Sequence, residues 1–165
     1  MPSTAMTAKL NEQITHEFHA SQHYLAMACA TDAMGLKVVP RWFREQAEEE
    51  REHALKILDY LLEVGARVKL AVLPPPPSEY KSVLAAAEAA LKSEKKVTKQ
   101  IHDLVALADK EKDYATRSFL NGFVDEQVEE LKHTGDLLQL AKMAGDNLLQ
   151  LESHLRHAMS KPAGG

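Results

Sequence analysis

The 165-residue chain has an ordinary globular composition, with 45% hydrophobic and 27% charged residues, which predicts a single domain with a sizeable core. A formal charge of −4 without a long basic run argues against nucleic acid or a membrane surface as the main partner. No stretch reaches the roughly 20 apolar residues of a membrane span, and residues 1–10 lack the apolar core of a signal peptide. The single cysteine, Cys29, agrees with a reducing compartment, so we expect a cytoplasmic protein.

The first two predicted elements are long helices that form a hairpin. The first should begin near Thr4–Thr7, where hydroxyl groups can cap it, and run to about Met34, with Gly35 able to adopt the left-handed stop. The second should carry Pro40 in its first turn and end at Gly65. Because the connection between them is short, we expect the two helices to be antiparallel neighbours.

Residues 66–78 break the helical pattern and contain four consecutive prolines, Pro74–Pro77. Such a run forms a stiff extended rod that rises about 3.1 Å per residue. About thirteen extended residues reach roughly 40 Å, close to the length of the helix before them. We therefore expect a long crossover that makes the third helix parallel to the second. Too little chain lies on either side for a linker between two domains.

Three further helices are predicted after the crossover. The third should cover about Ser78–Ala108, and the fourth should run from a cap at Asp113 to Ala144. A short fifth helix capped by Asp146 should follow, and residues 161–165 should form a frayed tail. The fold class is therefore all-α, a four-helix bundle with a long crossover between its second and third helices and a short C-terminal helix.

Polar residues interrupt the apolar face of each long helix. Glu50 and His53 lie three residues apart in the middle of the second helix's stripe, where a carboxylate and an imidazole can bind one metal ion. A charge buried there is costly unless a cation pairs with it. The other three stripes carry similar interruptions, namely Glu17, Glu94, and Gln127 with Glu130.

These interruptions should lie at one level of the bundle. Counted from each hairpin turn at about 1.5 Å per residue, Glu17 and His53 differ by about 3 Å, and Glu94 lies within a few ångströms of Gln127 and Glu130. The same stripes carry no lysine or arginine. An oxygen-rich set of this kind suits Fe(II), Mn(II) or Zn(II), and two ions bridged by Glu50 would neutralise it best. The pattern matches the di-iron carboxylate proteins built on helical bundles.

The same residues occur with flanking motifs over nearly the whole chain. They are Glu17, Tyr24, Glu49-Glu50-x-x-His53, Glu94 and Glu126-Gln127-x-x-Glu130, with Phe43-x-x-Gln46-Ala47 and Lys112-Asp113-Tyr114 around them. The combination resembles the bacterial non-haem ferritins. That resemblance implies a ferritin-like bundle assembled as a hollow shell of 24 subunits. It also implies ferroxidase activity: two Fe(II) ions are oxidised by O2 or H2O2 and stored as ferric mineral in the cavity.

The resemblance assigns a role to each polar residue of the layer. It implies that Glu17, Glu50 and His53 hold one iron of an intrasubunit di-iron centre. Glu50, Glu94 and Glu130 then hold the second iron, with Glu50 as the bridge.

Further residues surround these ligands. Gln127 is implied to orient the site through hydrogen bonds, and Tyr24 to lie beside the irons, where it can supply an electron or a hydrogen bond. With Glu130 shared, a third iron position between the centre and the cavity is matched by Glu49, Glu126 and Glu129. The alternative for these three is an ordinary solvated helix face.

Departures from related families limit the prediction. Bacterioferritins carry a second Glu-x-x-His in the fourth helix and a haem-binding methionine after the bridging glutamate. This chain has Gln127 to Glu130 without a histidine, and Arg51 after Glu50, so no haem is expected. The early fourth helix lacks the acids that line the three-fold pores of animal ferritins, which leaves the iron entry route open. DNA-protecting mini-ferritins lack the fifth helix and build their site between subunits, whereas this chain has a predicted fifth helix and a full set of candidate ligands within one subunit.

Several histidines lie outside the predicted centre. His16, His19 and His23 share one face of the first helix, offset from the core stripe. They suggest a surface metal site, a subunit contact or a chance grouping. His154 and His157 on the fifth helix would approach a four-fold axis if the shell forms.

Two other classes of function are alternatives to the ferroxidase hypothesis. One is a metal-binding cage without oxidase turnover. The other is a di-iron peroxidase or oxygenase, which requires a substrate cleft of which the sequence gives no sign. The sequence leaves open the choice of oxidant, regulation and any partner that reduces and releases iron.

Overall fold

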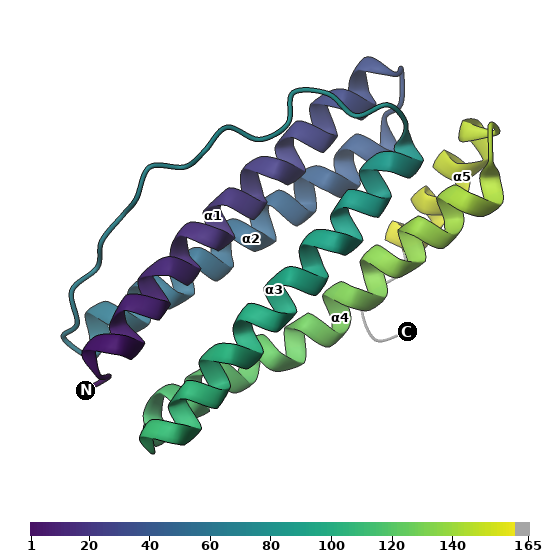
Figure 1. Ribbon diagram of the computed structural model, residues 1–165. Coiled ribbons are helices and arrows are strands. Elements are labelled where there is room, and N and C mark those ends of the chain that lie inside the picture. The colour runs from purple at the N-terminus through teal and green to yellow at the C-terminus, as the bar shows by residue number, and fades with distance from the viewer. Residues whose placement is uncertain (161–165) are drawn as a thin grey trace.

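The computed structural model describes residues 1–160, and within that range the chain forms five helices and no strand (Figure 1). Residues 161–165, for which a frayed tail is predicted, lie outside the described range. The helices are α1 (Thr4–Ala33), α2 (Val38–Glu63), α3 (Val83–Glu111), α4 (Tyr114–Ala144) and α5 (Leu148–Ser160). The all-α prediction of four long helices and a short fifth one is confirmed.

Most of the predicted helix ends are observed. Helix α1 begins at Thr4, as predicted, but its cap is Ser3 instead of a hydroxyl of Thr4–Thr7, because the Ser3 hydroxyl accepts the backbone N–H of Met6. Gly35 follows α1 with a positive φ of 88°. Pro40 is the third residue of α2, within its first turn. Asp113 caps α4, and Gly145 follows its last residue.

Two predicted starts are wrong. Helix α3 begins at Val83 instead of near Ser78, because the hydroxyl of Ser82 accepts a first-turn backbone N–H at 3.0 Å. Helix α5 is capped by Asn147 instead of Asp146, since the Asn147 side chain accepts a first-turn N–H at 3.1 Å. In both cases the residue that caps is the one whose oxygen reaches the free N–H groups of the first turn.

The crossover runs along the outside of the bundle for the length of α1 and α2 (Figure 1). It brings the chain back to the end where α2 began, so α3 is parallel to α2, as predicted. Asn11 of α1 fastens the crossover: its amide donates to the Arg67 carbonyl at 3.0 Å and accepts from the Lys69 N–H at 2.6 Å.

The bundle core consists of two apolar clusters with a polar layer between them. One cluster includes Phe43, Ala47 and Leu137, and the other includes Ile57, Ile101 and Phe123. Along each helix the two clusters lie on opposite sides of the predicted polar interruption. The buried residues of the layer between them are Glu17, Glu50, His53, Glu94, Gln127 and Glu130. The prediction that each helix turns its interruption into the interior is therefore confirmed.

Helix α5 is held to the bundle by Glu152. The Glu152 carboxylate accepts the backbone N–H groups of Lys37, Val38 and Val39, at 2.6, 2.7 and 2.8 Å, at the start of α2. Lys37 stands at the N-cap of α2, but its side chain makes no capping hydrogen bond. Glu152, far away in the sequence, caps α2 in its place. A carboxylate is favourable there because the free N–H groups and the helix dipole make a helix start positive.

Replacing Glu152 by alanine should loosen this end of the bundle. We expect Glu152→Ala to lower the free energy of unfolding by about 1–2 kcal/mol, because three N–H groups lose their acceptor. Urea unfolding followed by circular dichroism measures the change. Glu152→Gln keeps one acceptor oxygen and should cost less; equal losses for the two variants would contradict the capping role.

Candidate metal centre

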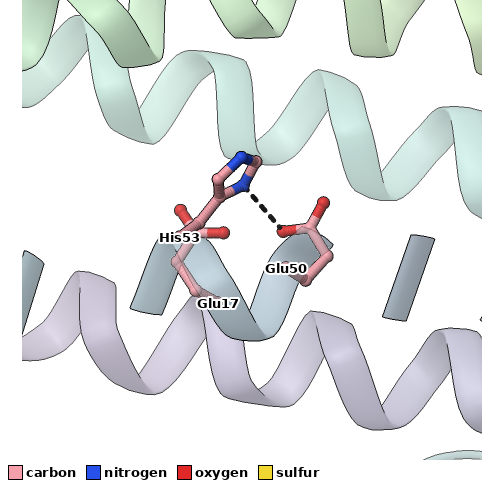
Figure 2. A group of neighbouring side chains, drawn as sticks. All are labelled: Glu17, Glu50 and His53. Carbon is pink, nitrogen blue, oxygen red and sulfur yellow. Dashed lines mark ion pairs between the residues drawn. The ribbon is translucent and has the colours of Figure 1, made fainter. Parts of the chain in front are cut away.

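Three ligand-type side chains from α1 and α2 meet inside the bundle. Figure 2 shows Glu17 projecting from α1 toward Glu50 and His53 of α2. One potential ligand atom from each lies within 4.8 Å of the other two, and all three side chains are buried. The Nδ1 atom of His53 is 3.7 Å from a Glu50 carboxylate oxygen, so the two flank a space that one ion can fill. Among residues 1–160 this is the one group of three or more such side chains that meets this distance.

The α3 and α4 side of the layer is organised around Glu94. The Tyr24 hydroxyl donates to one Glu94 oxygen at 2.5 Å, and the Gln127 amide donates to the other at 3.2 Å. The Gln127 amide also reaches the Thr98 hydroxyl at 3.0 Å. Glu94 is thereby held from both sides, by Tyr24 of α1 and by Gln127 of α4. Glu130 is buried in the same layer.

Four carboxylate oxygens in this layer are buried without a hydrogen-bond partner in the described part of the chain. They are Glu17 Oε2, Glu130 Oε2 and both oxygens of Glu50. Leaving a buried charged acceptor unpaired is costly, so such oxygens mark a missing partner. Within residues 1–160 no lysine or arginine forms an ion pair with these acids. The rival explanation, an ordinary internal salt bridge, therefore does not account for them.

Without a cation the buried acids favour their protonated forms. Burial, followed by the charge of Glu50, raises the pKa of Glu17 well above its usual value. Burial and the charge of Glu94 do the same for the pKa of Glu50. Burial and the neighbouring Glu49 raise the pKa of Glu130 to about 9. Glu50 is affected by acids on both sides of the layer, which is the position a bridging ligand requires.

The orientation of His53 is set by Glu126, which the sequence assigned to the third iron position. The Nε2 atom of His53 lies 2.8 Å from Glu126, which also pairs with Lys56 at 3.0 Å. The hydrogen bond to His53 lowers the pKa of Glu126 to about 2. Burial by itself lowers the pKa of His53, but Glu126 and Glu17 raise it overall. Glu126 therefore turns Nδ1 of His53 toward Glu50, as metal-binding histidines require.

The three residues predicted to form a third iron position are not among the ligand-type side chains that converge within 4.8 Å of one another. Glu49 and Glu129 are exposed, and Glu126 is paired with His53 and Lys56.

Sequence reasoning missed Gln13. This side chain is 2% exposed, and its amide donates to Glu17 at 2.8 Å. The available signal was its position four residues before Glu17, which places both on one face of α1. Gln13 fixes one Glu17 oxygen and leaves the other facing the centre.

Comparison with known proteins identifies the family. The sequence pattern described as the ferritin-like domain matches residues 7–144. The chain belongs to the ferritin family. It is 45% identical over 121 residues to a bacterial non-heme ferritin of Staphylococcus saprophyticus, which is 73% of this chain and 72% of that protein. It is 41% identical over 130 residues to the corresponding Staphylococcus haemolyticus protein, 79% of this chain and 78% of that protein.

A solved structure of the family has the same fold. The open pore ferritin from the hyperthermophilic archaeon Archaeoglobus fulgidus superposes with a TM-score of 0.91 at 42% identity, over 94% of this chain and 98% of that one. The resemblance to bacterial non-haem ferritins found in the sequence is therefore confirmed at the level of family and fold.

The raised pKa of Glu130 predicts how the stability of the metal-free protein depends on pH. In the unfolded chain this carboxyl ionises near 4.5, whereas in the fold it ionises near 9. The contribution of Glu130 to the free energy of unfolding is therefore fully present below about pH 4.5 and is lost as the pH rises through about 9. Between these values the free energy of unfolding of the metal-free protein should fall with pH more steeply than that of Glu130→Gln. The difference in slope should reach about 1.4 kcal/mol per pH unit. Urea unfolding at several pH values tests this, with Glu129→Gln, an exposed neighbour, as the control that should keep the parental slope.

Proposed function

We propose that this ferritin-family chain is a cytoplasmic iron-storage protein that oxidises Fe(II) at its buried centre. The observation that carries the proposal is the layer of buried acids from all four long helices, with orphaned oxygens and no cationic side chain among them. Such a donor set, rich in carboxylate oxygen with one imidazole, suits Fe(II). Iron is here the substrate of the reaction and the material that is stored.

The proposed sites follow the geometry of the layer. Glu17, Glu50 and His53 hold one Fe(II), because their ligand atoms already converge. Glu94 and Glu130 hold the second across the layer, with Glu50 shared between the ions. Two doubly charged ions and four carboxylates balance in charge, which offsets the cost of burying the acids.

Iron binding is coupled to proton release. The carboxyl groups of Glu17, Glu50 and Glu130 favour the protonated form in the metal-free protein because their pKa values are raised. Each must lose its proton to act as a ligand. The centre therefore binds iron more readily at higher pH. This is the pH range in which ionisation of the buried acids destabilises the metal-free bundle.

The oxidation step transfers one electron from each of two Fe(II) ions. O2 accepts the two electrons with two protons to give H2O2, and H2O2 as the oxidant accepts two electrons and two protons to give two waters. Tyr24 keeps its hydroxyl proton, because burial and the charge of Glu94 raise its pKa well above the usual value. Tyr24 and Gln127 hold Glu94 in place during the reaction through their hydrogen bonds to its two oxygens.

We assign the third iron position to Glu49, Glu126 and Glu129 with Glu130, as a transit site for oxidised iron. Glu126 must first leave His53 and Lys56 for an ion to occupy it.

Two described grooves bear on the alternative of chemistry on an organic substrate. Both lie along α1 and α3, and neither is lined by a proposed iron ligand. A di-iron peroxidase or oxygenase needs a substrate cleft that reaches the metals. A cage that binds metal without turnover remains the competing class, and iron oxidation kinetics separate the two.

Glu50 is the decisive residue for the oxidation reaction. Adding Fe(II) anaerobically and then admitting air should give rapid O2 consumption and a transient absorbance. Because Glu50 serves both ions, Glu50→Ala should slow the fast phase by at least about a hundredfold. Glu48→Ala changes an exposed acid two residues away and should behave like the parent. Oxidation by Glu50→Ala at the parental rate would refute the assignment.

Storage further requires a closed assembly. The resemblance to bacterial ferritins implies 24 subunits, so light scattering should report a particle about 24 times the 18.3 kDa chain mass. A particle near 18.3 kDa would leave a di-metal bundle without a store.

A further inference from the structure

A second group of metal-binding side chains lies outside the buried layer, in a groove between α1 and α3. The groove has a volume of about 650 Å³, and the last part of the crossover contributes to its lining. Its lining includes His16, His19 and His23 of α1, Lys96 of α3, and Pro77 and Tyr80. None of the proposed iron ligands lines it, so the groove is separate from the centre.

His19 and His23 are already arranged as a pair. They lie four residues apart on one face of α1, the spacing at which two helical histidines bind one ion. Their Nε2 atoms are 3.1 Å apart, and their rings meet edge to face with centroids 4.4 Å apart. Both side chains are half-buried, which already limits their rotamers. They therefore lose less side-chain entropy when an ion binds.

The nitrogen separation fits two ligands of one ion. Imidazole nitrogens about 2.0–2.1 Å from a metal lie about 2.9 Å apart at a right angle and about 3.4 Å apart at the tetrahedral angle. The observed 3.1 Å falls between these values. We propose that His19 and His23 form a second metal site, specific for borderline divalent ions such as Cu(II), Zn(II) or Ni(II). Its remaining coordination positions face the groove and are filled by water.

The charges around the pair set the strength of this site. Four lysines line the same groove, namely Lys92, Lys95, Lys96 and Lys99. Of the acids near it, Glu12 pairs with Lys9 and Asp103 with Lys99, each at 2.7 Å. Burial and the charges of His19 and Lys96 lower the pKa of His23, which keeps this imidazole neutral at neutral pH. The lysines repel a cation, so the ion is held weakly enough to exchange with solvent.

Copper binding tests the proposal, with electron paramagnetic resonance as the readout. Cu(II) is added to the full-length protein in the Glu17→Gln/Glu50→Gln background, which removes two of the four carboxylates that would compete for copper at the buried centre. We expect one Cu(II) per chain with hyperfine splitting from two equivalent nitrogens. His19→Ala and His23→Ala should each weaken binding about a hundredfold, because a single imidazole loses the chelate effect.

Two controls fix the interpretation. His102→Ala removes a lone exposed histidine of α3 and should leave the signal unchanged. Lys96→Ala should tighten copper binding, because it removes a repelling charge. The proposal is overturned if the two-nitrogen signal is absent or survives in His19→Ala, since the pair is then only a hydrogen bond. It is also overturned if Lys96→Ala weakens binding, since the groove then holds an anionic complex.

Discussion

The structure depends on one electrostatic constraint: four acids are buried in the middle of the bundle, and within residues 1–160 no lysine or arginine pairs with them. Such a layer is unfavourable for the protein alone, and burial forces the carboxyl groups toward their protonated forms. It becomes favourable when divalent ions replace the protons. The instability of the metal-free layer and the proposed binding of iron to it therefore have the same physical origin.

The rest of the fold supplies the stability that this layer lacks. Apolar clusters pack on both sides of it, so each long helix is anchored above and below its polar interruption. Hydrogen bonds from Gln13, Tyr24 and Gln127 fix individual carboxylate oxygens and leave others facing the centre. These hydrogen bonds orient a few carboxylate oxygens on helices whose apolar faces are packed, which is the preorganised ligand set that a metal site requires.

The predictions succeeded where helical periodicity decides the outcome. A residue's place on a helix stripe follows from local spacing, so Glu17, Glu94 and Glu130 were correctly placed in the interior before any contact was known. The start of α3 and the cap of α5 were wrong because two candidate caps stand near each start, Ser78 and Ser82 before α3 and Asp146 and Asn147 before α5. Which of them reaches the free N–H groups depends on the path of the preceding loop.

By itself, the sequence determined the helical class, the crossover, the family and the level at which the polar residues meet, because each follows from periodicity, chain length or motif. Only the tertiary structure decided which side chains pair across the bundle. Glu152 reaches the start of α2, Glu126 turns to His53, and His19 meets His23 beside the lysines of α3. These contacts depend on side-chain rotamers and on how far one helix is rotated against another, and neither quantity is encoded in the spacing of residues along one helix.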